Sequence, residues 1–298
     1  MSPIEVLPLP QACGAEVRCG PIQDIDDETF REIYQAWLDH LVLVFREQRI
    51  TDPEFRDFGK RFGPLKSASI GPSGGRSREA EEEPDVHVVS NVMENGVPIG
   101  ILGNGDVGWH SDMASFLEPP TASLLHALEV PPGGGDTLFL NMYLAYETLP
   151  EDVKRRILGL TIKHEVQDNS SGSGTGASHP IVSTHPESGS NALYLGAREN
   201  TFVNDLPRPE SDALLDGLWA HVIQWRFIWR HQWRRGDVVV WDNRCLMHAR
   251  QGFDPGARRV LHRIQVQGRA RPTTGADALE RPPHRRFLRK AAGPGFPC

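Results

Sequence analysis

The second half of the chain is a succession of short apolar segments divided by turn residues, and this pattern constrains the fold more than any other feature. The clearest segment is 121–130, where alternate residues share one face of an extended chain. One face carries Leu124, His126, Leu128 and Val130. The run Pro131-Pro132-Gly133-Gly134-Gly135 then forces a turn. Such short, punctuated segments are typical of strands that fold back on one another.

Similar segments recur along the chain, and helical patterns occur mainly early. We predict strands at 41–45, 86–89, 121–130, 137–140, 160–166, 181–183, 192–195, 227–233, 237–241 and 260–266. We predict a first helix capped by Asp27 and a second that begins at a Thr51/Glu54 capping box. Further helical segments are predicted at 143–158, with a break at Pro150, and at 209–224. Together these predict a mainly β protein with helical buttresses, built as a β-sandwich or jelly-roll barrel.

The length of 298 residues suits one catalytic domain over 1–298. We place its core at about 17–268, with mobile Gly- and Ser-rich loops at about 67–84 and 169–178. The Pro- and Arg-rich C-terminal tail, about 269–298, is expected to fray.

Composition excludes several classes of partner. The formal net charge of −7 disfavours nucleic acid, which requires a basic face. No apolar run approaches the length of a membrane span, and no signal peptide is recognisable, so we expect no membrane association and a cytoplasmic enzyme. The four cysteines form no paired CxxC unit and are too sparse for a disulfide framework. Only five of the 32 basic residues are Lys, which is typical of a GC-rich bacterial genome.

A candidate metal site begins at Trp109-His110-Ser111-Asp112. On an extended segment His110 and Asp112 point to the same side, so an imidazole and a carboxylate can reach one ion. A second histidine from a distant strand would complete a 2-His-1-carboxylate face, the arrangement of non-haem Fe(II) oxygenases. Of the 12 histidines, only His110 has Asp two residues later. His185-Pro186-Glu187 is a competing His-x-Glu, but its Pro/Gly-rich turn predicts solvated loop residues.

The Gly172-Ser173-Gly174-Thr175-Gly176 stretch does not indicate nucleotide binding. No Lys-Ser/Thr follows it, and the spacing of the dinucleotide fingerprint is absent.

Four motifs together resemble the taurine dioxygenase / 2,4-dichlorophenoxyacetate dioxygenase family. They are WHSD at 109–112, GGDT at 134–137, WDNR at 241–244 followed by His248, and RRVLHR at 258–263. They occur in the family's order, and the resemblance extends from about Val17 to Gly268. It implies a double-stranded β-helix, the jelly-roll or cupin-like core. It also implies Fe(II), 2-oxoglutarate and O₂ as cofactor and co-substrates.

The resemblance also implies roles for individual residues. His110, Asp112 and His248 would ligate the iron, and Thr137 and Arg259 would hold the distal carboxylate of 2-oxoglutarate. An Arg side chain suits that task because its fork binds a carboxylate through two parallel hydrogen bonds.

The substrate is expected to be a small organic acid. Arg263, four residues after Arg259, faces the same side of a strand, and its family counterpart pairs with the substrate's carboxylate or sulfonate; the alternative is a structural salt bridge. The other predicted substrate contacts are Met113, Ser115, Phe116, Phe202 and Asn204. Arg258 and His262 alternate to the opposite face and are expected to be structural. The segment 64–68 lacks the histidines that taurine enzymes place there, which disfavours taurine, and Lys66 there is either an anion contact or simply exposed.

The expected reaction converts 2-oxoglutarate to succinate and CO₂ and couples this to C–H oxidation of the substrate. Hydroxylation is the default outcome, with desaturation, epoxidation or cleavage of a C–S or C–O bond as alternatives. A jelly-roll Zn²⁺ hydrolase is a different class of enzyme, but it would need no dicarboxylate anchor such as Thr137 and Arg259. A non-enzymatic protein with a degenerate site is disfavoured because all three ligand types are intact. Family members often form homo-oligomers, although the sequence shows no interface signature.

Overall fold

The structure is a computed structural model that describes residues 4–67, 85–165, 176–284 and 287. Its larger sheet contains, in spatial order, β1 (Glu5–Pro8), β2 (Ala15–Arg18), β3 (Val42–Phe45), β17 (Val238–Asp242), β9 (Ala122–Glu129), β19 (Val260–Val266), β4 (His87–Ser90) and β7 (Ile101–Leu102). A second sheet contains β16 (Ile228–His231), β10 (Thr137–Asn141), β18 (Leu246–Arg250) and β8 (Val107–His110).

Smaller sheets and helices surround these two. The small sheets are β12 (Ser178–Pro180) with β11 (Thr161–His164) and β15 (Thr201–Val203), β13 (Val182–Thr184) with β14 (Asn191–Leu193), and β5 (Met93–Glu94) with β6 (Val97–Pro98). The helices are α1 (Asp27–His40), α2 (Asp52–Lys60), α4 (Met142–Glu147), α5 (Glu151–Ile157) and α6 (Arg208–Val222), with short 3₁₀ turns at Ile22–Asp24 and Trp225–Phe227. The prediction of a mainly β protein with helical buttresses is confirmed.

The larger sheet is buried on both faces along its centre. On one face, Leu124 and Ile264 pack with Phe30, Trp37 and other apolar residues of α1 and α2. On the other face, residues of β3, β9 and β17 join the core that includes the second sheet. The predicted alternation of β9 is therefore correct, but apolar side chains bury both of its faces.

The predicted local signals for helices are mostly confirmed. Thr51 and Glu54 form the complete capping box of α2, and the helical segment after residue 142 is interrupted at Pro150. The predicted cap of α1 is one residue off. Asp26, not Asp27, accepts the Thr29 backbone N–H, because Asp26 is still extended and Asp27 is already helical.

The prediction of a fraying C-terminal tail is wrong for the part that the structure describes. Val182 and Thr184 of β13 hydrogen-bond with the segment 273–275, and Asn191 of β14 donates to the Ala278 carbonyl. Ala278, His284 and Phe287 are buried. The predicted mobile loops, 67–84 and 169–178, lie almost entirely outside the described residues.

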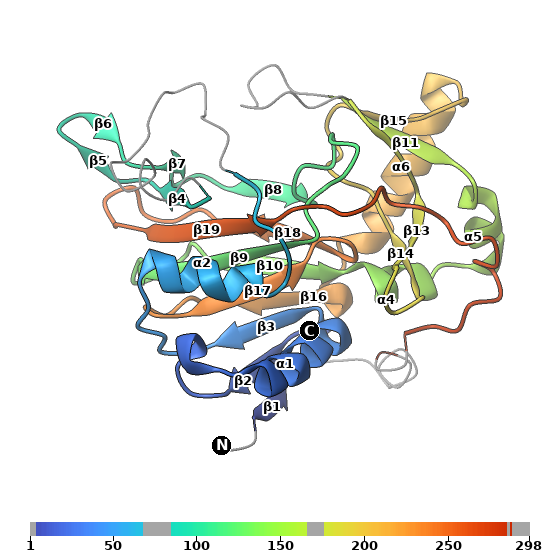
Figure 1. Cartoon of the computed structure of the whole chain (residues 1–298). Coiled ribbons are helices and arrows are strands. Elements are labelled where there is room, and N and C mark those ends of the chain that lie inside the picture. The colour runs from blue at the N-terminus through green and yellow to red at the C-terminus, as the bar shows by residue number, and fades with distance from the viewer. Residues whose placement is uncertain (1–3, 68–84, 166–175, 285–286, 288–298) are drawn as a thin grey trace.

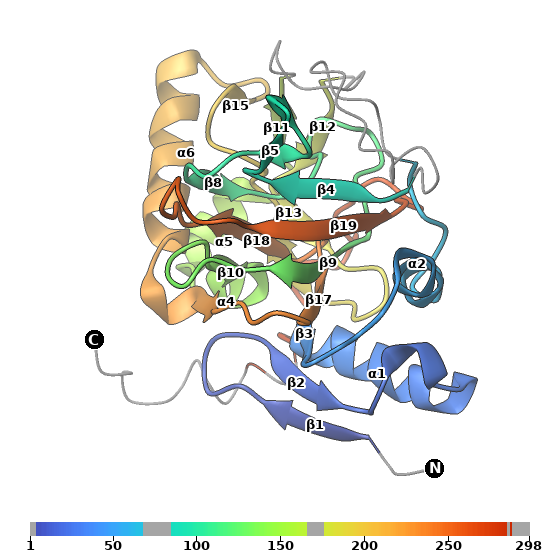
Figure 2. The same ribbon diagram turned by 90° about the vertical axis from the view of Figure 1, so that its left-hand side faces the viewer.

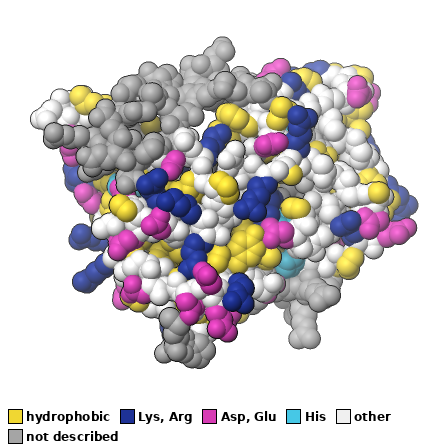
Figure 3. Space-filling view, viewed as in Figure 1, with side chains coloured by type: hydrophobic (Ala, Val, Ile, Leu, Met, Phe, Trp, Pro, Cys, Tyr) yellow, Lys and Arg dark blue, Asp and Glu magenta, His cyan; other side chains and the backbone are white. Residues whose placement is uncertain are grey.

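Figures 1 and 2 show β1, β2 and α1 together at one end of the molecule, and α6 beside β11 and β15 at the other. Basic and acidic side chains are interspersed on the face drawn in Figure 3. No helix in the described part of the chain has the length and apolar character needed to span a bilayer.

Candidate active site

Strand pairing in the second sheet brings the predicted metal ligands together. β8 pairs with β18 so that His110 lies directly opposite His248, and their ring centroids are 4.2 Å apart. Asp112 follows two residues after His110, just beyond the end of β8. Its Oδ1 lies 3.7 Å from His110 Nε2 and 3.9 Å from His248 Nε2. One ligand atom from each of the three side chains lies within 4.8 Å of the others.

The surroundings of these three side chains favour binding of a divalent metal. His110 Nδ1 donates to the Gly108 carbonyl at 2.8 Å, which leaves the Nε2 lone pair free. Burial, together with His110 nearby, lowers the pKa of His248 to about 3, so this imidazole is neutral. Burial opposes ionisation of Asp112, but His248, His110 and Arg263 outweigh it and hold its pKa well below the usual range. The Asp112 carboxylate, the neutral imidazole of His248 and Nε2 of His110 therefore converge on one point.

A series of buried hydrogen bonds supports the Asp112 carboxylate through Oδ2. Ser123 Oγ donates to Asp112 Oδ2 at 2.6 Å, and Asn243 Nδ2 donates to Ser123 Oγ at 2.9 Å. Trp241 Nε1 donates in turn to Asn243 Oδ1 at 2.9 Å. Ser123 is completely buried. This series occupies Oδ2 and leaves Oδ1 facing the two histidines. Sequence reasoning missed Ser123 and Asn243, although Asn243 lies within the WDNR motif.

Thr137 and Arg259 both lie close to a third residue, Trp233. Trp233 Nε1 donates to Thr137 Oγ1 at 3.0 Å, and the Arg259 guanidinium carbon lies 6.0 Å from the Trp233 ring. Gly135 makes room for Arg259, because a Cβ there would lie 3.2 Å from Arg259 Nε and φ is +69°. This explains a glycine of the GGDT motif. Trp233 carried no signal in the sequence that would have singled it out.

Arg259 is a buried cation that lacks a carboxylate. It is 2% exposed and forms no ion pair with any described residue, and its Nε has no hydrogen-bond partner. Burial, with Arg250 nearby, lowers its pKa to about 9. A buried, unneutralised guanidinium is costly, so this position favours an anionic ligand.

Arg263 approaches Asp112 at Oδ1, the carboxylate oxygen that Ser123 does not occupy. Its NH1 is 3.8 Å from Asp112 Oδ1, and its side chain is 17% exposed. β19 pairs with β4 so that Arg263 is opposite His87, and burial together with Arg263 lowers the pKa of His87 to about 4. Nearby, Lys66 Nζ lies 4.3 Å from the centre of the Phe116 ring. Lys66 is therefore partly buried rather than freely exposed. His87 is another residue that sequence reasoning missed.

The remaining predicted substrate contacts fall into two groups. Met113, Ser115 and Phe116 follow Asp112 directly, and Met113 has a positive φ of 52° that turns the chain there. Phe202 and Asn204 belong to the region of β15 in a different sheet. Asn204 donates to Thr161 and Ser178, and the Arg208 guanidinium lies over Phe202. No contact among the described residues joins this second group to the metal cluster.

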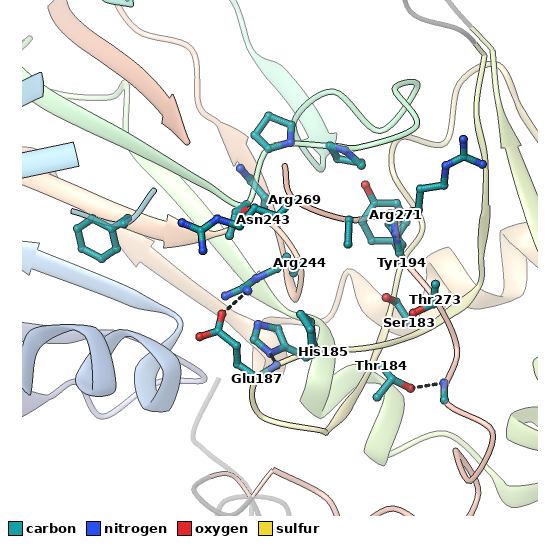
Figure 4. A pocket seen from close by; sticks show the side chains of 18 of the residues that line it. Ser183, Thr184, His185, Glu187, Tyr194, Asn243, Arg244, Arg269, Arg271 and Thr273 are labelled. Carbon is teal, nitrogen blue, oxygen red and sulfur yellow. Dashed lines mark hydrogen bonds and ion pairs between the residues drawn. The ribbon is translucent and has the colours of Figure 1, made fainter. Parts of the chain in front are cut away.

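The prediction that His185 and Glu187 are solvated loop residues is wrong for His185. His185 is 2% exposed, and its Nε2 bonds to Asp242 Oδ2 at 3.0 Å. Its Nδ1 accepts the backbone N–H groups of Glu187 and Ser188. Arg244 pairs with both Asp242 and Glu187, and Figure 4 shows its contact with Glu187. Although His185, Asp242 and Cys245 lie close enough for a metal, these bonds already occupy both His185 nitrogens.

Arg258 and His262 are structural, as expected. Arg258 forms an exposed ion pair with Glu129, and His262 Nδ1 bonds to Asp52 Oδ1 at 2.6 Å. Neither contacts the metal cluster.

Comparison with known proteins agrees with this geometry. The family model described as "Taurine catabolism dioxygenase TauD, TfdA family" matches residues 5–265. Pentalenolactone F synthase of Streptomyces arenae is 32% identical over 88% of this chain and 94% of its own. The α-ketoglutarate-dependent 2,4-dichlorophenoxyacetate dioxygenase of Burkholderia sp. (strain RASC) is 35% identical over 76% of this chain and 82% of its own.

Solved structures agree as well. A taurine dioxygenase from Burkholderia xenovorans superimposes with a TM-score of 0.78 at 30% identity, covering 93% of this chain and 94% of that one. AAD-2 in complex with Mn(II) and N-oxalylglycine gives 0.73 at 28% identity, covering 92% of this chain and 100% of that one.

The mainly β fold, the His-Asp-His cluster and these relatives define the class as the α-ketoglutarate-dependent dioxygenases, oxidoreductases that use Fe(II), 2-oxoglutarate and O₂. Within that class, the chain belongs to the TauD/TfdA family.

Proposed function

We propose that this chain couples the oxidative decarboxylation of 2-oxoglutarate, to succinate and CO₂, to C–H oxidation of a small carboxylate or sulfonate. Hydroxylation is the default outcome. The observation that carries the proposal is the presence, within one core, of the His110–Asp112–His248 cluster and of the buried, unneutralised Arg259. We also propose that the two main sheets form a double-stranded β-helix in one catalytic domain.

The three side chains fit Fe(II), because two imidazoles and one carboxylate leave open positions on the metal. Bound iron supplies the redox chemistry, and the protein supplies position and exclusion of water. Ser123 holds Asp112 so that Oδ1 faces the metal position. Arg259 and Thr137 anchor the distal carboxylate of 2-oxoglutarate, and Trp233 orients the Thr137 hydroxyl.

Arg263 supports an acidic substrate. Its ion pair with Asp112 is long, at 3.8 Å, and its Nε has no hydrogen-bond partner, so the guanidinium retains donors for a second anion. Lys66 and Phe116 lie together in the same neighbourhood and supply a cation and an apolar surface. Several relatives are named for acidic substrates, including (S)-phenoxypropionate and sulfonates, which agrees with this inference. The segment around Lys66 makes taurine itself the less favoured sulfonate.

The test is a substrate panel in which 2-oxoglutarate consumption and succinate formation are measured. Phenoxyacetates and alkanesulfonates should support turnover, and their methyl esters or amides should not. Arg263→Gln should raise KM for the acids and leave 2-oxoglutarate binding unchanged. Equal turnover of the neutral analogues would refute the acidic-substrate proposal. Succinate formation by Asp112→Ala at the wild-type rate would refute the metal assignment.

A second outcome is cleavage of a C–O or C–S bond after hydroxylation at the adjacent carbon. Relatives named as a 2,4-dichlorophenoxyacetate dioxygenase and an alkylsulfatase favour it. Mass analysis of the product distinguishes cleavage from a retained hydroxyl group, desaturation or epoxidation. Oxygen consumption that depends on 2-oxoglutarate excludes the zinc hydrolase.

A further inference from the structure

A cavity of about 620 Å³ lies beside the metal centre but is lined by none of its residues. Its walls come from the ends of β13 and β17, the segment 119–121, and the chain from Arg269 to Arg281 (Figure 4). This volume falls within the range of about 300–1,000 Å³ that is typical of small-molecule pockets. Asn243 forms part of the wall, and through Ser123 it is two hydrogen bonds from Asp112.

Two of the arginines that line the cavity, Arg269 and Arg271, are exposed and pair with no carboxylate among the described residues. Of its four arginines, Arg244 is neutralised by Asp242 and Glu187, and Arg281 by Asp277. Arg269 and Arg271 have no ion pair or hydrogen bond with any residue that the structure describes. Arg269 passes close to Gly63, where a Cβ would lie 3.0 Å from Arg269 NH2.

Tyr194 also lines the cavity and is 3% exposed. Its hydroxyl is inaccessible to solvent, so Tyr194 contributes ring surface to the wall rather than a hydrogen-bond donor.

The cavity also has apolar surfaces and a fixed wall. Tyr34 and Phe62 stack with ring centroids 6.0 Å apart, and both line it. The C-terminal wall is held to β13 by bonds from Thr184 N to the Thr273 carbonyl, from Thr274 Oγ1 to the Val182 carbonyl, and from Gly275 N to Thr184 Oγ1. The pocket is therefore already formed without a ligand, so binding requires little ordering of the chain.

We propose that this cavity is a second ligand site, distinct from the metal centre, for a small organic acid with a flat apolar body. Arg269 and Arg271 bind the acid group, and the aromatic wall packs against the body. The proposal goes beyond the oxygenase function and needs no turnover to be tested.

The probe is 8-anilinonaphthalene-1-sulfonate, an aromatic sulfonate whose fluorescence reports binding. It is titrated into protein loaded with Mn(II) and N-oxalylglycine, which fill the metal centre. Arg269→Gln and Arg271→Gln should each weaken binding by about three- to tenfold, as expected for loss of a charge-assisted hydrogen bond at a partly exposed site.

The matched control is Arg226→Gln, because Arg226 is exposed and lies outside the cavity. It should bind the probe as the wild type does. Wild-type affinity in both pocket variants would overturn the proposal. So would a loss seen in Arg263→Gln but not in the pocket variants, since it would place the probe at the metal centre. Inorganic sulfate should compete only weakly, because it lacks the apolar body.

Discussion

Replacing Ser123 by Ala should weaken metal binding without touching a metal ligand. The Ser123 hydroxyl donates to Asp112 Oδ2 at 2.6 Å and accepts from Asn243 Nδ2 at 2.9 Å, and the residue is completely buried. The substitution removes one oxygen atom. It frees the Asp112 carboxylate to rotate and leaves the Asn243 amide without its acceptor. No water can easily replace the hydroxyl in so small a space.

The size of the effect follows from these contacts. A hydrogen bond to a charged group contributes about 1.5–3 kcal/mol, and about 1.4 kcal/mol corresponds to a factor of ten in an equilibrium constant. Loss of a residue that orients a metal ligand typically costs about 10–100-fold in metal affinity. The two estimates agree. We therefore expect the Kd for Mn(II), used as a redox-stable substitute for Fe(II), to rise by about 10–100-fold.

The assay is a titration of Mn(II) followed by electron paramagnetic resonance of the free ion. Ser211→Ala is the matched control, because Ser211 is also buried and its hydroxyl accepts the Val203 N–H at 2.8 Å. Both variants should lose a similar amount of stability on thermal unfolding, but only Ser123→Ala should lose metal affinity. A folded Ser123→Ala protein that binds Mn(II) as tightly as the wild type would refute the reasoning.

Three further predictions concern the co-substrate site and the buried charges. Arg259→Gln should raise the Kd for N-oxalylglycine, measured by calorimetry at saturating Mn(II), by about tenfold or more. The exposed control Arg258→Gln should leave this Kd unchanged, and equal affinities of the two variants would contradict the role of Arg259 as the carboxylate anchor. Asp242→Asn should lower the free energy of unfolding in urea by about 3–5 kcal/mol, because it removes the charge of a buried carboxylate that bonds to both Arg244 and His185. Asp212→Asn, at an exposed pair, should cost under about 1 kcal/mol, and similar losses in the two variants would contradict this reasoning. Burial lowers the pKa of His164 to about 3, so below about pH 6.5 the unfolded chain takes up a proton that the folded chain does not. This group should therefore lower the stability of the apoprotein by up to about 1.4 kcal/mol for each unit by which the pH falls. The slope between pH 6 and pH 4 should shrink in His164→Gln, and an unchanged slope would exclude His164 as its source.

Local features of this protein could be predicted from the sequence because they depend on neighbours in the chain. The capping box at Thr51 and Glu54 involves residues three apart, and the strand 260–266 was predicted with the bounds that it has in the structure. The His110-x-Asp112 spacing is also local, so it could be recognised as half of a metal cluster. The family motifs then supplied His248, whose place opposite His110 depends on strand pairing.

Tertiary structure alone decided the surroundings of these residues. Ser123 meets Asn243 across 120 positions, and Trp233 meets Thr137 across 96. The pattern around His185 predicted a solvated turn, but in the structure His185 bonds to Asp242, 57 residues away. The tail forms a wall because backbone groups of β13 and the Asn191 side chain of β14 hydrogen-bond with it. The physical reason is that a sequence pattern reports which groups prefer burial or a turn, whereas the partner of a buried polar group is set by the pairing of distant strands. The sequence alone determined the chemistry available here, and the fold decided which groups orient it and which remain unpaired for a ligand.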